Sequence, residues 1–204
     1  MKIIKYEYAS KKGYNIFLDN GEIITLKEQV ITENELLFKK EINDKLYQKL
    51  IFENKIYELY EIAVKYINIR LRSIKEIKDY LTKKENNSEI IDKVCDKLLK
   101  NNYLDDERFT KAFIKDKLNF TTMGDYKIKK ELEKLGVDTV IIENNISQIS
   151  SSVLEERMTK IIDKDIRTNK KYSGINLKNK IYNHLLSSGY SVDLVIAVLN
   201  KYNF

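Results

Sequence analysis

The sequence predicts a mainly α protein: three tandem three-helix repeats in an elongated, curved array, preceded by a small antiparallel β meander and short helices. Short β-prone runs lie within residues 3–26. From residue 54 onward, apolar side chains recur at helical spacing between N-cap signals. The pattern Ile-x-x-x-Leu starts at Ile77, Ile128 and Ile181, a period of roughly fifty residues. Repeats of this length are typically supersecondary units that stack on their neighbours.

The N-terminal runs predict three strands, at residues 3–8, 14–18 and 22–26. Lys11-Lys12-Gly13 joins the first two, and Asp19-Asn20-Gly21 joins the second two. Asn-Gly readily supplies the positive φ angles of a tight hairpin turn. Because so small a meander buries little apolar surface alone, we expect it to pack on the helices that follow.

Helical signals begin at residue 32. Thr32 and Glu35 have the spacing of a capping box before Leu36 and Leu37, and a second short helix is predicted over 44–52. These helices complete a predicted N-terminal domain, residues 1–53.

The first predicted repeat, residues 54–103, has helices at 54–69, 73–83 and 88–101. Ser73 is the expected N-cap of the middle helix, with Glu76 completing a capping box, and Ser88 is the expected N-cap of the third helix. Tyr57 and Tyr60 lie on the apolar stripe of the first helix, where packing is favoured over base stacking.

The pattern recurs in residues 104–150, the second predicted repeat. Asp105 and Asp138 are the expected caps of its outer helices, and Gly124 precedes its middle helix. The third repeat, residues 151–204, ends in a helix for which Ser191 is the expected cap.

Charge and composition limit the function classes. The net charge of +6 and pI near 9.0 suit an anionic partner, although interspersed charges also suit a solvated helical surface. The single Cys95 precludes an internal disulfide and fits a cytoplasmic protein, and no apolar run suggests a membrane span.

No catalytic set is apparent, and we expect neither an enzyme nor a cofactor or metal. His184 is the only histidine, and the glycines are isolated turn residues without a phosphate-binding motif. Asp105, Asp106 and Glu107 could form a carboxylate site, but acidic side chains are also expected at a helix N-terminus.

Basic strips at equivalent positions of the repeats are the best candidates for binding. Lysine, which dominates them, suits phosphates better than bidentate readout of bases. The candidate contacts with DNA or a filament are Arg70, Arg72, Lys75 and Lys78 in the first repeat, Lys127, Lys130 and Lys134 in the second, and Lys170, Lys171, Lys178 and Lys180 in the third.

Two segments resemble the bacterial RecX regulatory proteins. The first is residues 63–77, which include Arg70-Leu71-Arg72-Ser73, and the second is Tyr103-Leu104-Asp105-Asp106-Glu107-Arg108-Phe109 with its continuation to residue 113. The family often has proline where this chain has Leu71, and Gly-Pro-Arg-Arg where it has Gly124-Asp125-Tyr126-Lys127.

The resemblance implies tandem three-helix units similar to helix-turn-helix domains. It also implies a non-enzymatic modulator of the RecA recombinase that lies in the groove of the RecA–DNA filament and lowers ATP hydrolysis and strand exchange. We expect the protein to be a monomer. Single- or double-stranded DNA is a further implied partner. The alternatives are a general DNA-binding module that acts without RecA, and an enzyme with a carboxylate site at Asp105 or Asp106.

Overall fold

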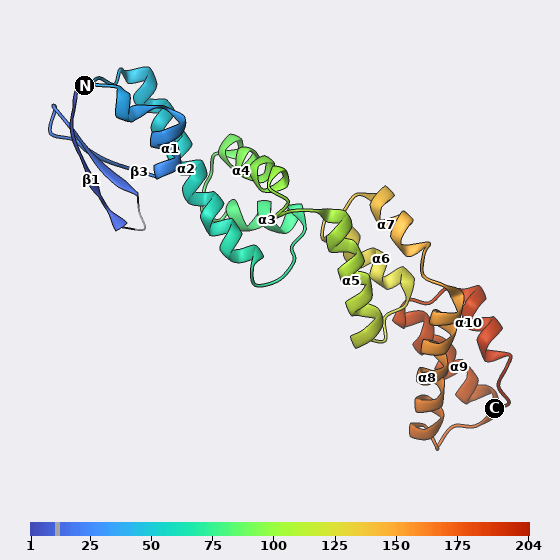
Figure 1. Cartoon of the computed structure of the whole chain (residues 1–204). Coiled ribbons are helices and arrows are strands. Elements are labelled where there is room, and N and C mark those ends of the chain that lie inside the picture. Colours follow the sequence, from blue (N-terminus) through green and yellow to red (C-terminus); the bar gives the residue numbers. More distant parts are fainter. Residues whose placement is uncertain (11–12) are drawn as a thin grey trace. The chain divides into compact units, whose positions relative to one another are not determined.

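A computed structural model describes residues 1–10 and 13–204 (Figure 1). It is mainly helical, with a small antiparallel sheet at the N-terminus, as the sequence predicts. The described chain divides into two compact units, residues 1–72 with 76–104, and residues 73–75 with 105–204. No helix among the described residues is both long and apolar enough to cross a bilayer.

The sheet has the order β1 (Ile3–Tyr8), β2 (Tyr14–Leu18) and β3 (Ile23–Leu26), and both pairings are antiparallel. Gly21 adopts a φ of +85° in the turn between β2 and β3, which explains the glycine there. Lys11 and Lys12 of the other predicted joint lie outside the described residues.

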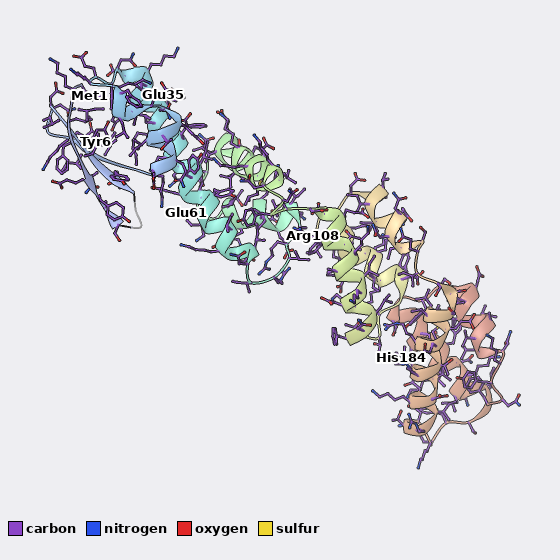
Figure 2. The ribbon with its side chains drawn as sticks, viewed as in Figure 1. Met1, Tyr6, Glu35, Glu61, Arg108 and His184 are labelled. Atoms are coloured by element: carbon purple, nitrogen blue, oxygen red, sulfur yellow. The ribbon has the colours of Figure 1, made fainter. Side chains whose placement is uncertain are left out.

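One face of the sheet packs on the helices that follow, as expected. Ile16 and Leu26 are fully buried there. The Tyr6 hydroxyl donates to the Leu36 carbonyl at 2.9 Å (Figure 2). This bond ties the sheet to a single 3-10 turn, η2 (Leu36–Phe38).

The helix predicted to start at Thr32 is not formed. Thr32 does not start a helix but lies near the end of α1 (Glu28–Glu33), and its hydroxyl donates to the Glu28 carbonyl. Glu35 has a φ of +50°, so the chain turns there, and η2 buries Leu36 completely. Core burial of Leu36 therefore decides the local structure over the capping-box spacing.

The helices predicted at 44–52 and 54–69 form one helix, α2 (Asp44–Ile67). No glycine or proline interrupts the sequence between them. Asn54 is accommodated inside the helix because its side chain accepts from the Lys27 amide at 2.8 Å and donates to the Thr25 carbonyl at 3.2 Å. The predicted domain boundary between residues 53 and 54 thus lies inside α2, and the division into four domains stays a prediction.

The remaining helices have the predicted order and nearly the predicted bounds. The N-cap of α4 is Asn87, not Ser88: its side chain accepts from the Glu89 and Ile90 amides. Asp105 and Asp138 cap their helices as predicted. The helices are α3 (Ile74–Leu81), α4 (Ser88–Lys100), α5 (Asp106–Phe120), α6 (Asp125–Lys134), α7 (Thr139–Ile146), α8 (Ser151–Thr168), α9 (Gly174–Ser188) and α10 (Val192–Leu199).

The repeated Ile-x-x-x-Leu pattern marks the cores. Both residues of each pair are fully buried, in α3, α6 and α9 alike. In the second unit, Ile128 of α6 and Ile181 of α9 belong to separate apolar clusters. Each middle helix therefore packs at the centre of its own helical group, which the spacing predicts.

Candidate nucleic-acid interface

The two arginines between α2 and α3 are held by neighbouring side chains. The Arg72 guanidinium lies 4.0 Å from the ring centre of Tyr66, which stacks on Tyr80, and the Arg72 side chain is only 10% exposed. Arg70 is half exposed and pairs with Glu76 at 2.5 Å, and Glu76 also pairs with Arg72 at 3.4 Å. Arg72 therefore offers a partner little surface, while Arg70 keeps an exposed face.

Lys78 of α3 also has an acidic partner. Its ammonium lies 2.7 Å from the Asp92 carboxylate of α4, and this hydrogen bond raises the pKa of Lys78. Three of the four candidate cations of the first repeat, Arg70, Arg72 and Lys78, thus face a carboxylate. These carboxylates reduce the net positive field that a polyanion would meet.

In the second unit, residues 73–75 contact the C-terminal end of α6. The Ser73 hydroxyl donates to the Leu135 carbonyl at 2.7 Å, and the Lys75 ammonium donates to the Lys134 carbonyl at 3.0 Å. Cations suit a helix C-terminus because its last carbonyls are unpaired and carry partial negative charge. Lys75 therefore stabilises the contact with the end of α6 in addition to contributing positive charge to the surface.

An equivalent contact joins the N-terminus of α6 to the C-terminus of α9. Gly124 donates its amide to the Ser188 carbonyl at 2.8 Å, and Tyr126 donates to the Gly189 carbonyl at 3.1 Å. Lys127 lies beside this contact, with its ammonium 3.4 Å from the Ser187 carbonyl. We call residues 124–127 and 187–190 the α6–α9 junction.

Three of the four lysines of α6, Lys127, Lys130 and Lys134, share one exposed strip, as predicted from their spacing. Lys130 pairs with Glu133 at 3.0 Å, and this bond raises the pKa of Lys130. Lys134 makes no side-chain hydrogen bond or ion pair with the described residues. The strip therefore keeps part of its charge.

The third group of lysines lies in the loop between α8 and α9 and in the first turns of α9. It differs from the other two groups because none of its lysines has a carboxylate partner among the described residues. Lys171 and Lys180 approach the Tyr172 ring, at 5.4 and 4.4 Å from its centre. Lys178 donates to the neutral Asn200 side chain at 3.2 Å, and Lys170 is exposed. We call Lys170, Lys171, Tyr172, Lys178 and Lys180 the loop cluster.

Tyr172 was not among the contacts predicted from the sequence, although an aromatic residue directly after two lysines could have indicated a nucleic-acid contact. Its side chain is 37% exposed. An exposed aromatic ring among cations combines the two contacts that single-stranded nucleic acid uses, stacking and phosphate neutralisation. The loop cluster is therefore the strongest candidate site among the predicted contacts.

The acidic residues and His184 have structural contacts. Asp105 caps α5, and Asp106 accepts from the Ile74 amide at 2.9 Å. His184 lies 2.6 Å from the Asp165 carboxylate. In the described chain, no group of three His, Cys, Asp or Glu side chains is placed to hold a metal ion.

The family model of the first three-helix domain of RecX matches residues 60–98, and that of the second matches residues 105–144. A regulatory protein RecX from Finegoldia magna is 34% identical over 209 residues, covering 99% of this chain and 100% of the relative. One from Halalkalibacterium halodurans is 29% identical, covering 94% of this chain and 74% of the relative.

Two solved structures have the same fold. A crystal structure of regulatory protein RecX is similar with a TM-score of 0.87 and 21% identity, covering 98% of both chains. RecX from Lactobacillus salivarius has a TM-score of 0.69 and 24% identity, covering 73% of this chain and 97% of that one. At these identities the likeness establishes the fold alone.

Proposed function

The chain belongs to the RecX family of regulatory proteins, and from that premise we propose that it binds the RecA–DNA filament and inhibits RecA ATP hydrolysis and strand exchange. It acts in the cytoplasm, as a monomer without catalytic activity of its own, in the control of recombinational repair and the SOS response. The observation that carries the proposal beyond the family is the loop cluster, where lysines surround an exposed tyrosine.

The charge distribution supports a graded role for the candidate contacts. Lysines without a carboxylate partner retain their full attraction for phosphates, whereas Arg72 and Lys78 are already engaged by Glu76 and Asp92. We therefore propose that the loop cluster and the α6 strip supply most of the electrostatic contact, and that Arg72 mainly holds the joint.

The test is a titration of the full chain against the cognate RecA filament, assembled on single-stranded DNA, with ATP hydrolysis as the readout. Inhibition at less than one protein per RecA subunit is expected, because a regulator lying along a filament contacts several subunits. An ATPase rate that stays unchanged at saturating protein refutes the proposal.

Tyr172 also favours a second function, general binding of single-stranded DNA without RecA. Stacking on its ring tolerates any base, and the flanking lysines would neutralise phosphates. This function predicts tight binding to bare oligothymidylate with a steep salt dependence, since each neutralised phosphate releases counterions. Weak, salt-insensitive binding to the bare strand, together with ATPase inhibition, would favour the RecA-dependent function.

A further inference from the structure

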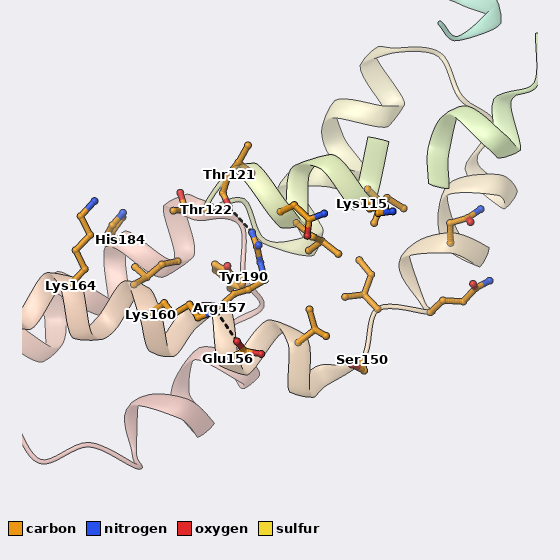
Figure 3. A pocket seen from close by; sticks show the side chains of 18 of the residues that line it. Lys115, Thr121, Thr122, Ser150, Glu156, Arg157, Lys160, Lys164, His184 and Tyr190 are labelled. Atoms are coloured by element: carbon orange, nitrogen blue, oxygen red, sulfur yellow. Dashed lines mark hydrogen bonds and ion pairs between the residues drawn. The ribbon is translucent and has the colours of Figure 1, made fainter. Parts of the chain in front are cut away.

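A groove in the second unit shares no lining residue with the loop cluster. It has a volume of about 970 Å³ and runs between α5 and α8 (Figure 3). Its apolar lining is aliphatic, and Val153 is 39% exposed within it. The aliphatic residues are Ile114, Leu118, Ile149, Val153 and Ile161.

Hydrogen bonds from Arg157 fix one wall of the groove. Arg157 of α8 donates from Nη2 to the carbonyls of Thr121 and Met123, at 2.7 and 3.0 Å, which fixes the segment after α5. Tyr190 lies beside Arg157 and is 3% exposed. Burial raises the pKa of Tyr190, partly offset by the Arg157 charge, so this wall keeps a neutral phenol. The groove is therefore largely pre-formed.

The charges along the groove are unbalanced. Its two carboxylates are engaged, Glu156 with Lys160 at 2.7 Å and Asp165 with His184 at 2.6 Å. Lys115 of α5 and Lys164 of α8 are exposed, and their ammonium groups make no hydrogen bond or ion pair with the described part of the chain. A ligand entering the groove thus meets an aliphatic floor beside two uncompensated ammonium groups.

This chemistry discriminates between partner classes. Nucleic-acid bases are usually bound by stacking on exposed aromatic rings, but in this lining Tyr190 is buried and the His184 ring is engaged with the Asp165 carboxylate. Aliphatic anchors suit an aliphatic floor, and carboxylates are complementary to the unpaired lysines. We propose that the groove binds a protein segment that presents aliphatic side chains between carboxylates. This goes beyond the proposed function, because it requires neither DNA nor the loop cluster.

The probe for this proposal is a library of short random peptides displayed on phage and selected against the full chain. Selected peptides are expected to combine Leu or Ile with Asp or Glu. Synthetic copies should bind wild type in fluorescence anisotropy and lose roughly tenfold or more in affinity with the double variant K115E/K164E, because both lysines then repel the carboxylates.

The matched control is K83E/K100E, which makes the same charge change at two exposed lysines outside the groove. Peptide affinity should stay within about twofold of wild type in this control, as expected for charges outside the contact. Circular dichroism checks that both variants are folded. A selection that enriches no such peptide overturns the proposal, as does peptide binding that survives K115E/K164E. A greater loss of oligothymidylate than of peptide binding in K115E/K164E would make the groove a nucleic-acid site and would also overturn it.

Discussion

The α6–α9 junction depends on a close approach of two glycines, so replacing Gly124 by alanine should separate α6 from α9. A Cβ at Gly124 would lie 2.3 Å from the Gly189 carbonyl oxygen and 2.6 Å from the Tyr190 amide nitrogen. Both are backbone atoms, which cannot turn aside as a flexible side chain would. The backbones must therefore move apart.

The cost follows from the contacts that this movement breaks. Lengthening the 2.3 Å contact to even 3.0 Å needs a shift of about 0.7 Å. The hydrogen bonds from the Gly124 and Tyr126 amides, at 2.8 and 3.1 Å, would lengthen with it. Two such bonds contribute about 1–3 kcal/mol, and disturbed packing adds about 1 kcal/mol or more. We expect G124A to lower the free energy of unfolding of the second unit by about 2–4 kcal/mol.

Urea unfolding measured by circular dichroism gives the loss, and hydrogen exchange locates it in residues 124–134 and 185–191. The control is G174A, since a Cβ at Gly174 meets no atom within 4 Å. Gly174 has a φ of +55°, so alanine there should cost only about 1 kcal/mol. A G124A protein that is as stable as G174A, or that keeps wild-type protection in both segments, would refute the close-packed junction.

Three further predictions concern other sites. Tyr172→Ala should weaken oligothymidylate binding by about 1–3 kcal/mol in anisotropy titrations while Tyr172→Phe retains it, and unchanged binding would exclude stacking. Arg72→Lys should lower the stability of the first unit by about 1 kcal/mol in urea, because lysine cannot stack flat on Tyr66; equal midpoints would contradict this. Burial raises the pKa of Cys95 from 9.0 to about 11. Between these two pH values the thiol stays mostly protonated in the folded protein but ionises in the unfolded chain. Stability should therefore fall between pH 9 and pH 11, and by pH 10 wild type should have lost about 1 kcal/mol more than Cys95→Val; parallel pH curves would be the contrary result.

Local signals in the sequence were reliable where the responsible contacts are also local. The Asn20-Gly21 turn, the caps Asp105 and Asp138, and the buried Ile-x-x-x-Leu pairs follow from spacing and residue type alone. The continuous α2 did not follow, because Asn54 has its partners in the strand and loop that precede α1.

The candidate site was predictable in composition but not in charge balance. The sequence shows each lysine, but not that Asp92 faces Lys78 or that Lys75 contacts the end of α6. These partners are distant in the chain and depend on helix packing. The groove was not predictable either, because its lining comes from α5, α8 and the segments around them.

We propose above that the lysines around Tyr172 bring this protein to the RecA–DNA filament. The most direct measurement compares the inhibition of RecA ATPase by wild type, by K170E/K171E/K180E, and by K45E/K83E/K100E, which reverses three exposed lysines of the first unit. The loop-cluster variant should need roughly tenfold or more protein for half inhibition, since the charges of three proposed phosphate contacts are reversed, while the control stays near wild type. Equal inhibition by all three proteins would show that the loop cluster does not bring the protein to the filament.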